Sequence, residues 1–332
     1  MPKHTCRTAV LALVVLMAAG CAGSLGRYAV KTPNHGKAVS QLNSHDASPD
    51  MRGAVIDHRF RVKVSDPEAV LSAWVIDPSN EKMFDNEHGL WFAVPVGATR
   101  QTRDPHSTVL ILHGFRHYKN DWAYLMWARF LAEHGYRVVL VDLRGHGAST
   151  GDWSTFGPGE ARDVRRVIDE LSRRELLAGD LGVFGGSYGA TTALHLAGMD
   201  RRVKCVVSIS AFSSMRGVLP TFAKAQLGGF SGLVGIWGYD AMVDAAGKAG
   251  GFDPDRSDAR LAMAKTEAYV LLMHSNADLH VPVENARDLA YAGGGRVKLV
   301  LFEDADHYSF GVQDATRVRR TALRWFNQYL KD

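Results

Sequence analysis

A serine set between glycines, Ser187 in "VFGGSYGATTALHLA", is the residue of this chain best placed to act as a nucleophile. Gly185 and Gly189 lie two positions to either side of it, where a sharp turn from a strand into a helix admits only small residues. Such a turn would push the Ser187 hydroxyl outward. It would also place the amide N–H of Tyr188 at a helix start, where N–H groups are unpaired and negative charge is favoured.

A histidine and an aspartate later in the chain could activate this serine, which needs a base to take its proton and an acid to orient that base. His307 in "LVLFEDADHYSF" follows the last apolar run, and Asp278 in "VLLMHSNADLHVPVENA" follows the run before it. Residues that follow buried parallel strands meet at one edge of the sheet, so we expect Ser187, Asp278 and His307 to converge. Asp304 and Asp306 also lie near His307, but directly adjacent side chains point apart, so we assign the acid to Asp278.

The chemistry that such a group performs is acyl transfer, which requires two N–H donors for the negative oxygen of the tetrahedral intermediate. Tyr188 would supply one of them. The loop "VLILHGFRHYKNDW" follows a predicted strand, and its Gly114 lets the backbone approach a substrate closely. We therefore expect the amide N–H of Phe115 to be the second donor. His113 and His146, which also follow predicted strands, are interpreted as structural.

Six mostly continuous apolar runs predict the strands that would position these residues, because strands buried on both faces of a parallel sheet show no alternation. Amphipathic helical patterns lie between them, for example over 161–171 and 318–330. Two earlier stretches, near 54–64 and 70–76, alternate and predict leading antiparallel strands. The sequence thus predicts an α/β fold with a mostly parallel central sheet flanked by helices. The six runs are 108–112, 137–141, 181–184, 203–209, 269–273 and 297–302.

One interval, residues 212–264, breaks this alternation and is interpreted as a mainly helical cap insertion. Phe230, Leu233 and Trp237 are spaced i, i+3 and i+7, so a helix would bring them onto one apolar stripe. We expect this stripe to line the substrate pocket; the alternative is that it packs the cap onto the core. No obvious cluster of acidic residues that could bind a peptide amine is found in this interval.

The N-terminus predicts export. Residues 1–20 carry a basic lead and then an uncharged apolar run that is too short to span a bilayer core of about 30 Å. The run ends in "AAGC", which resembles the lipobox of bacterial lipoproteins and implies that Cys21 is acylated and anchors the protein to a membrane of the bacterial cell envelope. A plain secretory signal is the alternative. Residues 21–50 are polar and predict a flexible tether, followed by the main domain over 51–332.

The charge and the cysteine content limit which partners and cross-links are expected. The formal net charge is +4 without a long run of Lys or Arg, so no nucleic acid partner is expected. Of the three cysteines, Cys6 would leave with the signal and Cys21 would be acylated, so Cys205 would have no disulfide partner. Neither a metal nor an organic cofactor is expected.

Four blocks in order resemble the α/β-hydrolases, in their serine aminopeptidase-like and esterase/lipase-like branch. They are "HGF" at 113–115, "DLRGHGAS" at 142–149, "GGSYGA" at 185–190, and "NADLHVP" at 276–282 followed by "DADHYSF" at 304–310. The resemblance implies a serine hydrolase that cleaves a small-molecule ester or amide.

Two activities and one non-catalytic function are considered. The apolar insertion favours a carboxylesterase. The "GGSYG" form also resembles prolyl-oligopeptidase-type peptidases, so an aminopeptidase-like peptidase is an alternative. A non-catalytic envelope binding protein on a hydrolase scaffold is the alternative of another class.

Overall fold

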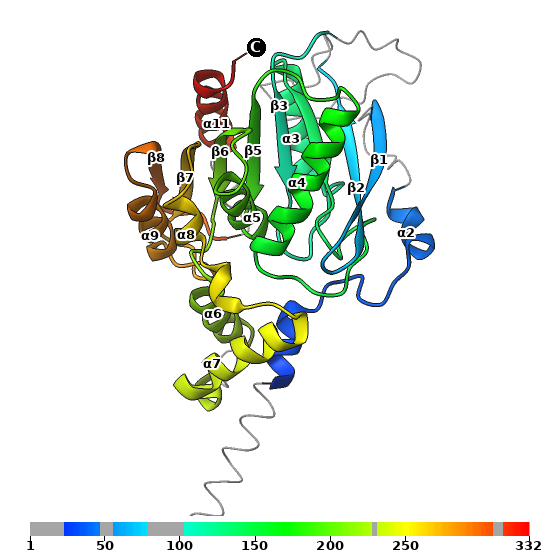
Figure 1. Ribbon diagram of the computed structural model, residues 1–332. Helices are drawn as coiled ribbons and strands as arrows, with labels where there is room; N and C mark the ends of the chain where they lie inside the picture. The colour runs from blue at the N-terminus through cyan, green and yellow to red at the C-terminus, as the bar shows by residue number, and fades with distance from the viewer. Residues whose placement is uncertain (1–22, 47–55, 79–102, 228–230, 308–314, 332) are drawn as a thin grey trace, which may run out of the picture.

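The computed structural model describes residues 23–46, 56–78, 103–227, 231–307 and 315–331 (Figure 1). A sheet of eight strands in the order β1-β2-β4-β3-β5-β6-β7-β8 forms its centre. β2 pairs antiparallel with both β1 and β4, and every other pair is parallel. The strands are β1 (His58–Val64), β2 (Ala69–Ile76), β3 (Thr108–Leu112), β4 (Arg137–Val141), β5 (Leu181–Gly186), β6 (Val203–Ile209), β7 (Tyr269–Ser275) and β8 (Val297–Phe302).

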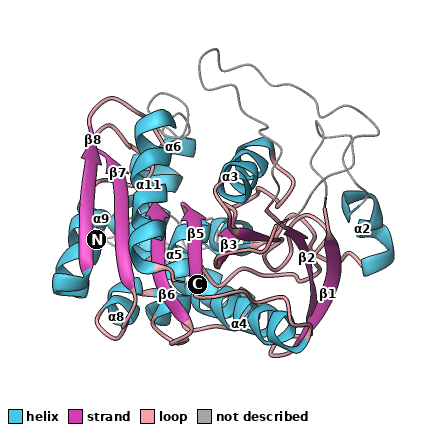
Figure 2. Ribbon diagram, turned by 90° about the horizontal axis from the view of Figure 1, so that it is seen from above, coloured by secondary structure: helices cyan, strands magenta, loops and turns pink. Residues whose placement is uncertain are grey.

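Helices cover both faces of the sheet (Figure 2). One core contains the buried sides of α4 and α5, and the other contains those of α3 and α11. In β3, Leu110 and Leu112 belong to the first core, whereas Val109 and Ile111 belong to the second. This explains why the strand sequences are continuously apolar, and it confirms the predicted fold class. The helices are α3 (Trp122–Glu133), α4 (Pro158–Arg173), α5 (Tyr188–Ala197), α9 (Glu284–Gly293) and α11 (Ala315–Tyr329).

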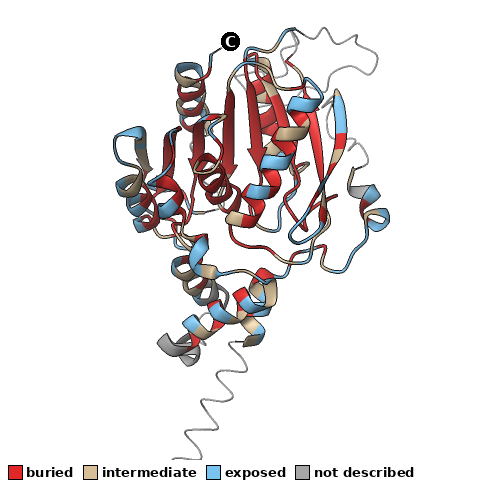
Figure 3. Ribbon diagram, in the orientation of Figure 1, coloured by how far each residue is buried: buried red, intermediate tan, exposed pale blue. Residues whose placement is uncertain are grey.

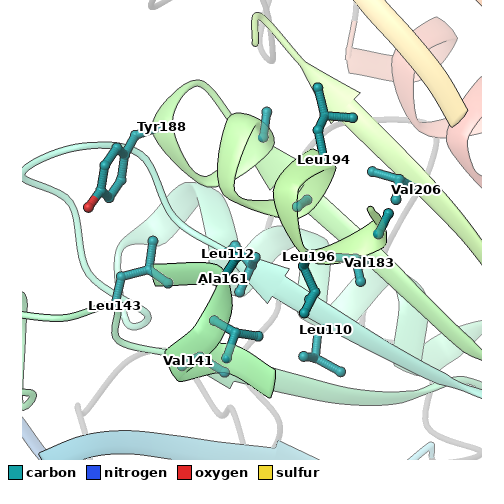
Figure 4. Packing of buried hydrophobic residues seen from close by; sticks show 14 of the residues in the cluster. Leu110, Leu112, Val141, Leu143, Ala161, Val183, Tyr188, Leu194, Leu196 and Val206 are labelled. Carbon is teal, nitrogen blue, oxygen red and sulfur yellow. The ribbon is translucent and has the colours of Figure 1, made fainter. Parts of the chain in front are cut away.

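The amphipathic stripes predicted for two of these helices face the sheet. Ala161 and Val164 in α4, and Val318 and Phe326 in α11, are all fully buried. Figure 4 shows the α4 side of the core, where side chains of β3, β4, β5 and α5 meet. Strands β2 to β7 are buried almost throughout, whereas the edge strands β1 and β8 and the outer sides of the helices carry exposed residues (Figure 3). No helix within the described ranges is both long enough and apolar enough to cross a membrane.

Between β6 and β7 the described residues form helices and short connecting loops, without a strand. α6 (Met215–Leu227) and α7 (Ser231–Gly250) lie together beyond one end of the sheet (Figure 1), and η2 (Pro254–Ser257) and α8 (Ala259–Met263) lead back to it. Of the predicted apolar stripe, Phe230 lies outside the described residues. Leu233 and Trp237 belong to α7, but their side chains lie outside the description as well, so the stripe stays a prediction.

The flexible tether expected over 21–50 is wrong for residues 23–46, which pack on the domain. Val30 and Leu42 are fully buried. The Asn34 side-chain amide donates to two carbonyls of the loop after β4, at 2.8 and 2.9 Å. Residues 23–30 form a helix so close to α7 that a Cβ on Gly26 would lie 2.0 Å from the carbonyl oxygen of Met242. The polar composition of this segment suggested a flexible tether. A few of its residues, however, are buried or make hydrogen bonds inside the domain, and these hold it in place.

The last residue of α2 (Val39–Asp46) joins a buried cluster of charged and polar groups. The ammonium of Lys119 is fully buried and lies 2.6 Å from a carboxylate oxygen of Asp142, 3.1 Å from one of Asp46 and 3.0 Å from the Ser72 hydroxyl. Burial alone would raise the pKa of Asp46, but the Lys119 charge and the hydrogen bonds lower it overall. Two carboxylates thus stabilise one buried cation. Such partners are needed because a charge removed from water is destabilising unless it is paired.

We expect Asn34→Ala to lower the free energy of unfolding by about 1–3 kcal/mol, because the carbonyls of Gly147 and Ser149 lose their donor inside the protein. Chemical denaturation of a recombinant chain that begins before residue 23 would measure it. Asn43→Ala is the matched control on the same segment: Asn43 is exposed, and its change should cost no more than about 0.5 kcal/mol. Equal stabilities of the two variants would contradict the docked arrangement of residues 23–46.

Candidate active site

Ser187 sits on the sharp turn that joins β5 to α5. Its φ of 51° and ψ of −113° lie where a side chain other than glycine is strained. A Cβ on Gly185 would lie 2.4 Å from the carbonyl oxygen of Gly189, and a Cβ on Gly189 would lie 2.2 Å from that of Leu112. Both contacts are too short for any side chain. The glycines therefore allow α5 to start directly against the end of β3, and the amide N–H of Ser187 is fixed by the Ile209 carbonyl at 2.8 Å.

The structure brings together the three residues that the sequence selects. The Nε2 of His307 lies 3.0 Å from the Ser187 hydroxyl oxygen, and its Nδ1 lies 2.7 Å from a carboxylate oxygen of Asp278. Since Nδ1 faces a carboxylate, it donates its proton there, and Nε2 is left to accept the proton of the hydroxyl. Asp304 and Asp306 are exposed, in contrast to the buried Asp278.

The Asp278 carboxylate is held by several donors. One oxygen accepts the amide N–H groups of His280 and Val281, at 3.0 and 2.8 Å, and the other accepts His307. Burial would raise the pKa of Asp278, but the hydrogen bond and charge of His307 and the Val281 amide together lower it below its usual value. The carboxylate consequently remains ionised where it faces the imidazole.

A second buried histidine lies beside this carboxylate and was missed in the sequence. His274, at the end of β7, is 1% exposed, and its Nε2 lies 2.7 Å from the Val281 carbonyl and 3.7 Å from a carboxylate oxygen of Asp278. Burial lowers the pKa of His274 and favours the neutral ring. The hydrogen bond between His274 and the Val281 carbonyl holds the loop that carries Asp278. In the sequence, only its position four residues before Asp278 indicates that His274 could lie near the site.

The loops that carry Phe115 and Tyr188 rise from neighbouring strands, because Leu112 pairs with Gly185 in the β3–β5 register. The aromatic rings of Phe115 and Tyr188 contact edge to face, with centroids 5.5 Å apart. His113 accepts the Leu143 amide at Nε2, at 2.9 Å, which makes its Nδ1 the donor to the Gly114 carbonyl at 2.8 Å. His113 therefore supports the loop, in agreement with the structural role expected from the sequence.

The "DLRGHGAS" segment also has the contacts of a structural loop. The Arg144 guanidinium binds both carboxylate oxygens of Asp163, at 2.7 and 2.8 Å, and both residues are buried. His146 is buried, with Nδ1 2.7 Å from the Arg144 carbonyl. The Asp142 carboxylate accepts a hydrogen bond from the ammonium group of Lys119. In the part of the chain that the structure describes, no three His, Cys, Asp or Glu residues are grouped so as to hold a metal ion.

One side chain of the cap reaches the imidazole of His307. The ring of Phe222, in α6, has its centroid 6.3 Å from that of His307 and 5.8 Å from that of His280. The adjacent Thr221 hydroxyl donates to the His280 carbonyl at 2.9 Å, which ties α6 to the loop after Asp278. The sequence did not single out Phe222 as a site residue, because periodicity alone does not orient a helix of the cap.

Comparison with known proteins agrees with this architecture. Residues 107–237 match the family model described as "alpha/beta hydrolase fold". The structure is similar to that of an esterase from Pyrococcus furiosus, with a TM-score of 0.62 and 20% identity over 91% of this chain and 98% of that one. The chain has the α/β-hydrolase fold.

Proteins with peptidase names are also similar to this chain. The "Uncharacterized peptidase YuxL" of Bacillus subtilis is 30% identical over 262 residues, which are 72% of this chain and 37% of that protein. An acylaminoacyl peptidase of Pyrococcus horikoshii gives a TM-score of 0.58 with 18% identity, over 83% of this chain and 42% of that one. The chain thus spans little more than a third of the length of the curated relative.

Proposed function

We propose that this α/β-hydrolase is a serine hydrolase that works through an acyl-enzyme. The observation that carries the proposal is the position of His307, whose two ring nitrogens lie 3.0 Å from the Ser187 hydroxyl and 2.7 Å from the Asp278 carboxylate. A histidine held in this way can take the serine proton on one side while its positive charge is stabilised on the other. A non-catalytic binding protein would not require this geometry.

In the first half of the reaction, the Ser187 oxygen attacks the substrate carbonyl carbon as its proton passes to Nε2 of His307. The negative oxygen of the intermediate accepts the amide N–H groups of Phe115 and Tyr188. The intermediate then expels the alcohol or amine, which takes the proton from His307. In the second half, His307 takes a proton from water, the resulting hydroxide attacks the acyl-enzyme, and the acid is released with Ser187 restored. These steps need no metal or organic cofactor.

We expect a small-molecule ester as the preferred substrate. The similarity to the Pyrococcus esterase extends over 98% of that chain, and Phe222 places an aromatic ring beside His307 where an acyl or alcohol group would pass. Phe230, Leu233 and Trp237, which the sequence predicts to line the substrate pocket, would add an apolar wall. An apolar wall of this kind favours uncharged, partly hydrophobic substrates.

A peptidase is the second candidate, because relatives with peptidase names match much of the chain. The fold of the cap gathers three carboxylates that are scattered in the sequence: Asp240, Asp244 and Asp255 surround Arg216 at 3.3, 2.8 and 2.6 Å. All three are more than half exposed and already paired with that cation. They therefore do not favour the capture of a peptide amine over the binding of a neutral ester.

We also propose that the protein is exported and anchored at the bacterial cell envelope through acyl chains on Cys21. The support is the "AAGC" motif at the end of the apolar run. Two or more acyl chains give stable attachment to a membrane, whereas one is marginal.

Hydrolysis of p-nitrophenyl esters of increasing acyl length, compared with amino-acid p-nitroanilides, tests the proposed activity. We expect turnover of esters that exceeds turnover of anilides, together with labelling by a fluorophosphonate probe. Ser187→Ala is the control and should abolish both turnover and labelling. Labelling that persists in Ser187→Ala would contradict the assigned nucleophile, and dominant anilide turnover would establish the peptidase instead.

Asp278→Asn should lower kcat by a factor on the order of 10⁴, the scale of the same change in a serine protease, because His307 loses both its tautomer control and its counter-charge. Steady-state kinetics would measure the loss, and circular dichroism would verify folding. Asp304→Asn and Asp306→Asn are matched controls of exposed carboxylates near His307, and both should stay close to wild-type activity. A large loss in either control with Asp278→Asn unaffected would reverse the assignment of the acid.

Cys21→Ser should yield a protein that is unprocessed or released from the membrane, while the hydrolytic activity of its catalytic domain is retained. Membrane fractionation and mass spectrometry of the mature N-terminus would show it. A wild-type chain that begins beyond Cys21 and carries no lipid would refute the anchor without affecting the proposed chemistry.

A further inference from the structure

The phenol of Tyr124, in α3, lies between the two backbone segments that lead to the candidate oxyanion donors. Its oxygen accepts the amide N–H of Gly114 at 2.6 Å. A Cβ built on Gly114 would lie 3.2 Å from this oxygen, and a Cβ built on Gly186 would lie at the same distance. Gly114 directly precedes Phe115, and Gly186 directly precedes Ser187.

The hydrogen bonds of Gly114 show what this contact fixes. The Tyr124 oxygen holds its N–H group, and Nδ1 of His113 holds its carbonyl oxygen at 2.8 Å. That carbonyl belongs to the same planar peptide unit as the N–H of Phe115, which points to the opposite side of the unit. The N–H and the carbonyl of Gly114 are therefore both restrained. Because the peptide unit is planar, the orientation of the Gly114 carbonyl also sets the direction of the Phe115 N–H.

The helix that carries Tyr124 is a rigid support for this contact. Leu125, Ala128 and Leu131 of α3 are buried in the core on that face of the sheet. Burial raises the pKa of the Tyr124 phenol, so the oxygen that accepts the Gly114 N–H belongs to a neutral hydroxyl. A neutral oxygen is also compatible with negative charge developing nearby, whereas a phenolate would repel it.

We propose that Tyr124 is a positioning residue of the oxyanion site, which holds the peptide between Gly114 and Phe115 so that the Phe115 N–H points at the reacting carbonyl oxygen. This inference rests on the proposed serine hydrolase function. Preorganised donors stabilise the transition state more than the bound substrate, so the role of Tyr124 should appear in kcat rather than in KM.

Tyr124→Phe, measured with p-nitrophenyl acetate and p-nitrophenyl butyrate, tests this role. We expect kcat to fall by about 10- to 100-fold, somewhat less than the 10²–10³ that follows loss of a whole oxyanion donor, while KM changes by less than about three-fold. Tyr136→Phe is the matched control: the Tyr136 hydroxyl also makes a 2.6 Å hydrogen bond, to Asn327, and the residue is 3% exposed. It should lose a comparable amount of thermal stability and keep its kcat.

The outcomes separate the two proposals. A wild-type protein without Ser187-dependent hydrolysis would overturn the proposed function and this inference with it. An active wild type in which Tyr124→Phe keeps its kcat, or loses no more than Tyr136→Phe, would overturn this inference alone. If Tyr124→Phe does not fold, Gly114→Ala tests the same contact, because its Cβ would press against the phenol oxygen. An unchanged kcat in Gly114→Ala would then overturn the positioning role.

Discussion

The contact between the first turn of α5 and the end of β3 is the constraint on which the site depends. Gly189 lies so close to the Leu112 carbonyl that no Cβ fits between them, and Gly185 lies equally close to Gly189. With the helix held against the strand, Ser187 must take a strained conformation that carries its side chain out of the sheet. The loop after β3 is then forced to rise beside the same turn. Backbone packing thus brings the nucleophile and the candidate oxyanion donors to the same end of the sheet.

The rest of the site is placed by the order of the strands. β5, β6, β7 and β8 are parallel neighbours, so the loops after β7 and β8 emerge at the same sheet edge as Ser187. Asp278 and His307 need only short loops to meet there. Buried hydrogen bonds then fix the details: backbone amides and His274 hold the loop of Asp278, and Tyr124 and His113 hold that of Phe115.

The fold could be predicted because strands buried on both faces leave continuous apolar runs, and because glycines around Ser187 mark a turn that few folds require. Asp278 and His307 could be chosen by their places after two such runs. The contacts of Phe222 and Tyr124 could not be predicted, since they depend on how a helix is rotated over the site. The docking of residues 23–46 was missed for another reason. Residues such as Val30 and Asn34 contact parts of the chain more than 100 positions away, and no local pattern reveals such partners.

The buried ammonium of Lys119 limits where this protein can be shortened. Its charge is shared between Asp142, in the loop after β4, and Asp46, at the end of α2. The polar composition of the N-terminal segment suggests that a recombinant chain could begin after Asp46. Such a chain would leave the buried Lys119 cation with one carboxylate instead of two. Removal of one partner from a buried charge cluster costs roughly 3–5 kcal/mol, a large share of the stability of a typical domain. Soluble versions for crystallisation or assay should therefore begin before the helix at residues 23–30.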